Sequence, residues 1–594
     1  MKRRIIYNDD FRTVMSFDQH AYGLPATAQD LAQIVQRVRG TGITTYVMDS
    51  IEYDNKVYFA TERGTDWTTV DFMKYDHIPE FKGWDGGYGA AGRVMRKMRE
   101  QDREPLQVVI DSCRDMGIEP VAGVRMNDGH HDVELLSRES PDISFWLKEH
   151  PQYTVRVPGT GEPTRYADYS HEGVRDYRFG IIEELLEKFD FNGLELNWLR
   201  RPILFQPDHF VGSLGAIYEE RFEEVAPIMT AWLKQIRQLL DRTAQKRGKD
   251  RLCFGVRVLE TPQINRLVGI DLPAWIREAE LDYIVPSGFH STIFNIPVEQ
   301  FTAMCEGSNC AVIPSLFPNV CHTPKVMRTC QTEVYAAAAA NYYAGGAGGV
   351  QVFNHFHGAT QEGGIPFNSE ALTVIASPES VARYPVHHYY ITYPVQPCDT
   401  PDIQKRWATG VCGLRVWWDI TQAFEFYFGE DLEAGDRKLT RLRFKIFEMA
   451  PGDGELTTLM LNNIPFTCTS QWRRRVVCRT ATLGPGDTQW ESAREYKDLE
   501  LLAGDPITEA DAPAMLELLG TSLYDRAEWL SLRKGEGDGI GYHVFKLFEA
   551  DISSIPDSAL HKGMNRIFIR TGARRDGAME DPYMGELEIV TSTR

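Results

Sequence analysis

The most constraining feature of this sequence is a regular alternation of short apolar runs with helical patterns over its first half. Runs such as TTYVMDS (Thr44–Ser50) and RLCFGVRVLE (Arg251–Glu260) each follow a segment of helical periodicity. Eight such steps succeed one another, with a repeat of roughly forty residues. Strands that alternate with helices form a parallel sheet, and eight repeats favour a closed (β/α)8 TIM barrel over an open doubly wound sheet.

The pattern changes near Tyr384. Beyond it, apolar runs such as FEFYFG and HVFKLFEA alternate along the chain without long helical partners, which is typical of antiparallel β-structure. We therefore predict a catalytic barrel over residues 1–385 and a mostly antiparallel, jelly-roll-like β-sandwich over residues 386–594. The phrases LTTLMLNNIPF and LHKGMNRIFIRTG resemble pieces of galactose-binding-type sandwiches, which implies an accessory domain of that kind.

Composition excludes several classes of partner and chemistry. The net charge of -20 argues against a nucleic-acid partner, and no apolar run approaches the length of a membrane span. No GxGxxG follows a strand, and P-loop and GxSxG motifs are absent, so we expect no nucleotide cofactor and no nucleophilic serine. The ten cysteines form no CxxC pair, and no metal is expected. The chain is expected to be cytoplasmic, or exported with its signal removed; its oligomeric state is open.

One strand of the predicted barrel has a polar face. In the run GLELNW, Gly193, Glu195 and Asn197 point to one side, while the alternate residues are apolar, because side chains alternate along a strand. The leucines suit the side that faces helices, so Glu195 and Asn197 suit the inside of the barrel. Polar groups at the carboxyl end of a barrel strand lie where such barrels carry their chemistry.

The segment around this strand, YADYSHEGVRDYRFGIIEELLEKFDFNGLELNWLRRP, resembles a family of glycoside-hydrolase-like barrels. In that family a D-x-S-x-x-x-V-R-D-Y helix start leads to a fourth strand of the D-G-I-E-L-D-W-x-R-x-P type. The resemblance implies a glycoside hydrolase that acts on an oligosaccharide or polysaccharide. The sequence departs from the pattern at Asn192 and Asn197, where the family carries Asp, and this leaves Glu195 as the carboxylate of the strand.

Glycoside hydrolysis usually needs two carboxyl groups, about 5 to 5.5 Å apart for retention and about 6.5 to 9.5 Å apart for inversion. The third and fifth strands end alike, in GVRMND and GVRVLE, so that Asp128 and Glu260 follow GVR at the same offset. We predict Glu195, Glu260 and Asp128 as catalytic residues, with Glu195 and Glu260 as the preferred pair. Asp49 and Asp9 or Asp10 come next.

Arginines are expected beside these acids. Arg125 and Arg257 should point inward, and Arg200 and Arg201 begin the next loop, so guanidinium groups should exceed the needs of nearby carboxylates. Because arginine suits carboxylate and sulfate oxygens, we predict an anionic sugar, uronate or sulfated, as substrate. The predicted substrate-binding residues, all near strand ends, are Arg125, Asn127, His130, Asn197, Trp198, Arg200, Arg257, His290, Asn319, Asn354 and His355. Trp67 and Trp146 are further candidates for stacking on a sugar.

Two other functions stay open at this point. Asn197 stands where the family carries Asp, which is compatible with a barrel that binds glycans without hydrolysing them. The histidines near strand ends are compatible with a metal-dependent or base-dependent lyase or isomerase that acts on a sugar acid.

Overall fold

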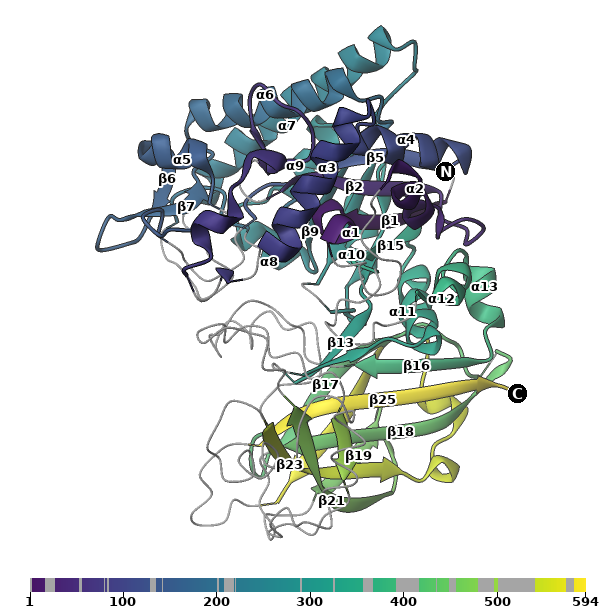
Figure 1. Cartoon of the computed structure of the whole chain (residues 1–594). Coiled ribbons are helices and arrows are strands. Elements are labelled where there is room, and N and C mark those ends of the chain that lie inside the picture. Colours follow the sequence, from purple (N-terminus) through teal and green to yellow (C-terminus); the bar gives the residue numbers. More distant parts are fainter. Residues whose placement is uncertain are drawn as a thin grey trace.

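The fold is taken from a computed structural model (Figure 1). The structure describes residues 3–16, 27–52, 56–78, 81–82, 85–128, 135–141, 143–199, 202–207, 218, 221–288, 291–323, 326–355, 367–391, 416–433, 435–447, 456–478, 496–499, 540–572 and 582–594.

The first half is a closed barrel of parallel strands. Its strands are β1 (Arg4–Asp10), β2 (Thr45–Glu52), β5 (Glu119–Arg125), β8 (Gly193–Asn197), β9 (Cys253–Leu259), β10 (Tyr283–Ser287), β11 (Ala311–Val312) with β12 (Ser315–Leu316), and β15 (Gly349–Phe353). Hydrogen-bonded neighbours run in the order β11, β10, β9, β8, β5, β2, β1, β15, β12. Because β11 and β12 are two halves of one short segment, the sheet closes on itself. The predicted TIM-barrel class is confirmed.

The register of the strands has the stagger of this class of barrel. Following paired residues once around the sheet from Ala311 leads to the level of Asn319, eight residues further along the chain. A shift of eight residues is the shear of (β/α)8 barrels. Closure also needs Gly349, because a Cβ there would lie 1.7 Å from the carbonyl oxygen of Arg4 on the neighbouring strand.

Helices follow most barrel strands and cover the outside. They are α2 (Ala28–Gln36), α3 (Ala90–Glu100), α4 (Pro105–Asp115), α6 (Glu172–Lys188), α7 (Phe222–Lys246), α8 (Pro262–Leu267), α9 (Leu272–Glu278), α10 (Val298–Met304) and α11 (Thr332–Ala344). Inside the barrel, Ile6, Val47, Val121, Val285 and Ile313 share a separate apolar cluster. None of the helices among the described residues is long and apolar enough to cross a bilayer.

The barrel half also contains shorter elements. They are α1 (Phe11–Ser16), β3 (Lys56–Val57), β4 (Thr65–Asp66), η2 (Trp67–Thr69), η3 (Phe72–Tyr75), η5 (Asp85–Gly89), α5 (Phe145–Glu149), η6 (Pro151–Tyr153), β6 (Thr154–Arg156), β7 (Pro163–Ala167), β13 (Asn319–Thr323), β14 (Val326–Thr329), α12 (Ser369–Val374) and α13 (Pro378–Arg383). The insertion between β2 and β5 is long, and it builds a layer of its own beside the barrel.

The C-terminal half consists of antiparallel sheets, as predicted. One sheet has the order β16 (Val386–Ile391), β25 (Tyr583–Thr593), β18 (Arg437–Phe447), β23 (Ile540–Ala550), β21 (Cys468–Cys478), β22 (Tyr496–Leu499). The other has the order β17 (Thr421–Phe428), β24 (Gly563–Thr571), β19 (Leu456–Leu461), β20 (Ile464–Pro465). Two short 3-10 helices, η9 (Ile552–Ser554) and η10 (Asp557–Ala559), follow β23.

The two halves lie next to each other (Figure 1), and hydrogen bonds join them. Asn295 Nδ2 donates to Glu425 O at 3.1 Å, and Asn341 Nδ2 donates to Tyr427 O at 3.0 Å, so that barrel side chains bind the edge of β17. Buried side chains of both halves belong to one continuous apolar cluster. The proposed domain boundary falls between the end of α13 at Arg383 and the start of β16 at Val386.

Candidate active site at the carboxyl end of the barrel

Glu195 points into the barrel, as its position in the strand predicts. Its Oε2 accepts hydrogen bonds from Tyr283 Oη at 3.1 Å and from Gln351 Nε2 at 2.9 Å, and these residues belong to β10 and β15. The side chain has no exposed surface. Its Oε1 is also buried, and no hydrogen-bond partner for it exists among the described residues. One oxygen of this carboxyl group is therefore held, and the other is available.

The surroundings of Glu195 favour its protonated form. Burial, together with the negative charge of Asp49, raises the pKa of Glu195 from 4.5 to about 7, against the opposing effects of Gln351, Arg257 and Tyr283. Burial acts this way because an ionised carboxylate loses hydration in the barrel interior. At neutral pH a large fraction of Glu195 therefore carries a proton.

Asp49 is the carboxylate that interacts electrostatically with Glu195. In the register of the sheet, Asp49 pairs with Gly123, which pairs in turn with Glu195, so the outer two Cα atoms lie about 10 Å apart, at two strand spacings. A Cβ at Gly123 would lie 2.2 Å from Asp49 Oδ1. The glycine therefore provides the space that lets the Asp49 carboxylate lie over β5, on the side of Glu195.

Asp49 is also held by polar neighbours. Arg125 Nε donates to Asp49 Oδ2 at 2.7 Å, and Asn8 Nδ2 donates to Oδ1 at 3.4 Å. Burial nevertheless raises the pKa of Asp49 from 3.8 to about 6, because desolvation outweighs the attraction of Arg125, and the nearby charge of Asp10 adds to the effect. Asp49 is thus mainly ionised at pH 7, whereas Glu195 is about half protonated.

Arg125 is surrounded by four carboxylates. It lies 2.7 Å from Asp49, 3.0 Å from Asp10, 3.5 Å from Glu52 and 3.4 Å from Asp128. These acids raise the pKa of Arg125 well above its ordinary value, although burial opposes them. The expected excess of arginine over carboxylate is therefore absent at Arg125, where acids outnumber the guanidinium.

Glu52 is the member of this cluster that sequence reasoning missed. Simple alternation from Asp49 places Glu52 on the outer face of β2. The register of β2 with β5 shifts between Asp49 and Ile51, a β-bulge that reverses the alternation and turns Glu52 inward. No sequence signal marks this bulge, since Ser50 and Ile51 are ordinary strand residues.

Arg257 lies on β9, two strands along the sheet from Arg125 on β5. Its Nη1 donates to Asn197 Oδ1 at 3.2 Å, its Nη2 donates to Ser287 Oγ at 2.9 Å, and its guanidinium lies 3.8 Å from the ring centre of Phe353. Asn197 Oδ1 also accepts from the backbone N–H of Leu199 at 3.0 Å. The amide of Asn197 thus orients Arg257.

The layer that contains Asn197, Arg125 and Arg257 forms the floor of the mouth. Asn197 is 2% exposed, Arg257 2% and Arg125 5%, whereas Glu195 and Asp49 are fully covered. Glu195 is two residues below Asn197 on the same strand, or about 7 Å deeper in the barrel. A ligand must therefore open this layer to reach Glu195.

Glu260 and Asp128 follow the ends of β9 and β5 and are fully buried. Glu195 pairs with Gly255, five residues before Glu260, which separates the two glutamate Cα atoms by about 16 Å along the strand direction. That offset exceeds the carboxyl separations of about 5 to 9.5 Å in glycosidases. Asp49 is better placed to act with Glu195, and the Glu195/Glu260 pair stays a prediction.

Two predicted sugar contacts serve other purposes in the structure. Trp198 is buried, with its ring centre 5.3 Å from that of Trp275 and 6.2 Å from that of Tyr169, so it packs against the outer helices instead of facing the mouth. Asn127 donates from Nδ2 to the carbonyl oxygens of Ala167 and Ile203, and thereby ties loop backbone together. Both side chains differ from expectation because their polar or aromatic groups are used locally.

The remaining candidates lie near the carboxyl end of β15 or outside the described residues. His355 is buried, and its Nδ1 lies 2.8 Å from Tyr335 Oη. Asn354 has a φ of 54°, in the left-handed region, at the end of β15. His130, Arg200 and His290 fall outside the described residues, and so does the side chain of Asn319, whose backbone lies in β13.

The raised pKa values of Asp49 and Glu195 predict how stability depends on pH. Because the folded protein binds these two protons more tightly than the unfolded chain does, their contribution is greatest below about pH 4 and is lost as pH rises to about 7. For Glu195 the loss is on the order of 3 kcal/mol. Urea unfolding of the wild type and of Glu195→Gln at pH 5 and pH 8 measures it. A pH dependence that is the same in both proteins would contradict the raised pKa.

Aromatic residues named as stacking candidates also lie away from the mouth. Trp67 is 2% exposed and packs 5.7 Å from Tyr58, while Trp146 stacks 4.0 Å from Tyr177, measured between ring centres. In the part of the chain that the structure describes, no group of three or more histidine, cysteine or acidic residues has the arrangement of a metal site.

The chain was compared with known proteins. No family model matches it, and no curated protein matches it. Among solved structures, it is similar to the PgaB (BpsB) glycoside hydrolase domain from Bordetella bronchiseptica, with 13% identity, 64% of this chain and 99% of that chain covered, and a TM-score of 0.35. It is also similar to the α-L-fucosidase isoenzyme 2 from Paenibacillus thiaminolyticus, with 10% identity, 64% and 49% covered, and a TM-score of 0.35.

A further similar structure is the GH36 α-galactosidase AgaA from Geobacillus stearothermophilus in complex with stachyose. It shows 12% identity, with 92% of this chain and 56% of that chain covered, and a TM-score of 0.32. The chain spans about half the length of the fucosidase and galactosidase chains. The structure thus has a distant resemblance to glycoside hydrolases, and no family is identified. Similarity at this level concerns the fold alone, so a function has to be inferred from the side chains of the mouth.

Proposed function

We propose that this protein is a glycoside hydrolase that cleaves an oligosaccharide or polysaccharide at the carboxyl end of its barrel. The observation that carries the proposal is the pair of interacting carboxyl groups, Asp49 and Glu195, buried in the barrel beneath the layer of Asn197, Arg125 and Arg257. Burial raises the pKa of Glu195 to about 7 and leaves Asp49 mainly ionised at neutral pH. One protonated and one ionised carboxyl group are what acid-assisted glycoside cleavage requires.

In the proposed reaction, Glu195 gives its proton to the glycosidic oxygen while the bond between that oxygen and the anomeric carbon breaks. Its unpartnered Oε1 is the atom placed to do this, because Oε2 is held by Tyr283 and Gln351. Asp49, oriented by Arg125, stabilises the positive charge that develops on the sugar ring. The oxygen of a water molecule then bonds to the anomeric carbon, and one proton of that water passes to the Glu195 carboxylate, which restores the acid.

The floor of the mouth must open for this reaction. Arg257 contacts the amide of Asn197, the hydroxyl group of Ser287 and the ring of Phe353 in this layer. We infer that the layer moves when a sugar binds, because it covers Glu195. Oxygen atoms of an acidic sugar suit this guanidinium, which supports a uronate or sulfated substrate.

A screen for reducing-end release tests the proposal. The full chain is incubated with matched sets of neutral, uronic and sulfated oligosaccharides at pH 5 to 8. We expect hydrolysis of at least one acidic set, at rates at least tenfold above those on the matched neutral set. Equal rates on the acidic and the neutral sets would contradict the proposed preference for an anionic substrate. No hydrolysis of any set would contradict the proposed function.

A glycan-binding barrel without catalysis is the second candidate. The amide at Asn197 favours it, since that position offers no carboxyl group next to Arg257. The variant Asn197→Asp separates the two functions, because it restores a carboxylate 3.2 Å from Arg257 Nη1. We expect Asn197→Asp to cleave no substrate that the wild type leaves intact. Activity that appears only in this variant would favour the binding barrel.

A further inference from the structure

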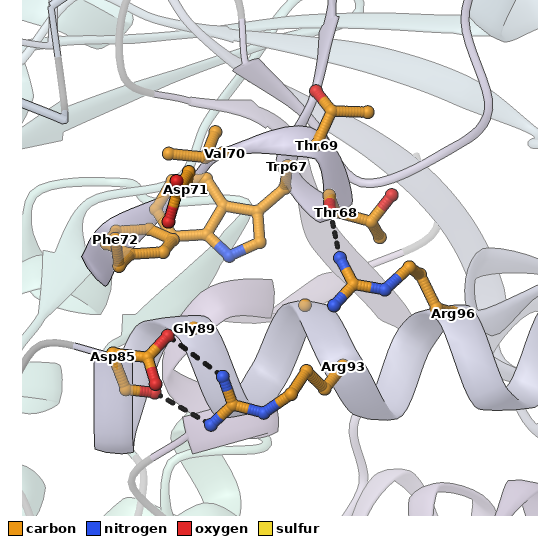
Figure 2. Close-up of a pocket in the computed structure, with 11 residues that line it drawn as sticks. Trp67, Thr68, Thr69, Val70, Asp71, Phe72, Asp85, Gly89, Arg93 and Arg96 are labelled. Carbon is orange, nitrogen blue, oxygen red and sulfur yellow. Dashed lines mark hydrogen bonds and ion pairs between the residues drawn. The ribbon is translucent and has the colours of Figure 1, made fainter. Parts of the chain in front are cut away.

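A cavity lies beside the barrel, in the insertion between β2 and β5. It has a volume of about 320 Å³ and is formed between η2 with η3 on one side and η5 with α3 on the other (Figure 2). Trp67, Phe72 and Asp71 line one wall, and Arg93 and Arg96 line the other. Small-molecule sites in proteins have volumes from about 300 Å³ upward, so one sugar unit is an occupant of suitable size.

The arginines near this cavity differ in their partners. Arg93 Nη1 donates to Asp85 Oδ1 at 2.9 Å, and Arg99, six residues further along α3, lies 2.6 Å from Asp66. Arg96 donates only to the backbone carbonyl of Thr68 (Figure 2), and no carboxylate of the described residues lies within ion-pair distance of it. Arg96 therefore brings a positive charge to the cavity wall without a matching acid.

Acceptors for hydroxyl groups lie on the facing wall. Asp71 is exposed at the cavity, and it makes no side-chain hydrogen bond at the start of η3. Trp67 and Phe72 also line the cavity, and each is only 2% exposed. A sugar acid matches the polar groups of the two walls, because its carboxylate suits a guanidinium and its hydroxyl groups donate to a carboxylate.

The cavity is connected to the mouth by a short series of contacts. The ring centre of Trp67 lies 5.7 Å from that of Tyr58, Tyr58 Oη donates to Glu52, and Glu52 lies 3.5 Å from Arg125. Trp67 and Tyr58 therefore lie in series between the cavity and the acid cluster.

We propose that this cavity is a secondary binding site for one uronic acid unit, with Arg96 holding the carboxylate and Asp71 accepting from hydroxyl groups. The inference deepens the proposed function and rests on it for the identity of the substrate. It adds a second contact for an acidic group, outside the mouth, to the contact proposed for Arg257.

Binding of glucuronate to the full chain tests this site. Calorimetric titrations compare glucuronate, glucose and acetate, with the wild type, Arg96→Gln and the control Lys97→Gln, which changes an exposed lysine of the same helix outside the cavity lining. We expect glucuronate to bind at least tenfold more tightly than glucose or acetate. We also expect Arg96→Gln to weaken glucuronate binding at least tenfold, whereas Lys97→Gln leaves it unchanged. Glutamine retains a donor for Thr68, so the fold should persist, which circular dichroism checks.

A second variant separates charge from shape. Arg96→Lys keeps the positive charge but loses the planar fork, so it should bind glucuronate more weakly than the wild type and more tightly than Arg96→Gln. Equal binding of glucose and glucuronate, equal binding of acetate and glucuronate, or undiminished binding by Arg96→Gln would overturn the inference. Because binding is measured without turnover, such a result leaves the hydrolysis screen unaffected. Conversely, a failed screen with intact binding contradicts only the proposed function.

Discussion

Replacing Glu195 with Gln should reduce glycoside hydrolysis by about 10²- to 10⁴-fold, the usual contribution of a general acid. Glutamine has nearly the same shape as glutamate, and its carbonyl oxygen can accept the hydrogen bonds that Tyr283 and Gln351 donate to Oε2. It has no proton to give to a leaving group. The measurement is kcat and KM on the best substrate from the screen, and we expect the loss to fall on kcat.

This variant should remain folded, which makes the result interpretable. Because burial raises the pKa of Glu195, its ionisation opposes folding at neutral pH, and Glu195→Gln removes that cost. The matched control is Glu119→Gln, which changes a partly exposed glutamate that pairs with Arg4 at the opposite end of β5. We expect the control to retain full activity. An active Glu195→Gln would show that Glu195 is not the acid.

Replacing Arg125 with Met should destabilise the fold by about 3 to 5 kcal/mol at pH 7, as expected when one partner of a buried ionic cluster is removed. Asp10, Asp49, Glu52 and Asp128 would be left in the barrel without their guanidinium. Urea unfolding measures the change. It should shrink as pH falls towards 5, because carboxylates that lose a positive neighbour take up protons more readily.

The control for this variant is Arg114→Met. Arg114 pairs with Asp190, but both side chains are about 40% exposed, and exposed ion pairs contribute at most about 1 kcal/mol. A loss at Arg125→Met as small as that at Arg114→Met would show that the four acids are not held by Arg125. A loss that does not depend on pH would point to packing instead of charge.

The barrel could be predicted because its sequence signals are repetitive. Eight apolar runs separated by helical segments specify a parallel closed sheet, and within GLELNW the alternation placed Glu195 inside correctly. The start of antiparallel structure after Tyr384 was visible for the same reason, since the helical partners disappear there. A pattern that recurs along the chain can be recognised even where single residues depart from it.

The details of the site were harder to predict, because they depend on residues that depart from the regular alternation along a strand. The bulge in β2 turns Glu52 inward, and the missing side chain of Gly123 lets Asp49 lie over β5. The bulge follows from the pairing of one strand with its neighbours, which a single sequence does not specify. The alternation predicts that Glu195 points inward, whereas Asp49, which shares its level of the sheet two strands away, ranked below Glu260 in the sequence analysis.

The roles of single side chains also depend on neighbours far along the chain. Trp198 follows a polar strand end, yet it packs against Trp275, nearly eighty positions later, on an outer helix. The sequence analysis predicts Arg125 as a contact for the substrate. In the structure Arg125 pairs with four acids, and three of them come from β1 and β2. Counting charged residues near the motif therefore predicted an excess of arginine over carboxylate, which is wrong for Arg125.

A crystal structure of Glu195→Gln soaked with an acidic oligosaccharide tests the central proposal most directly. The proposed function predicts a saccharide in the mouth, with the Arg257 layer displaced and the glycosidic oxygen within about 3 Å of residue 195. An oligosaccharide bound elsewhere, above a floor that still covers residue 195, would contradict it.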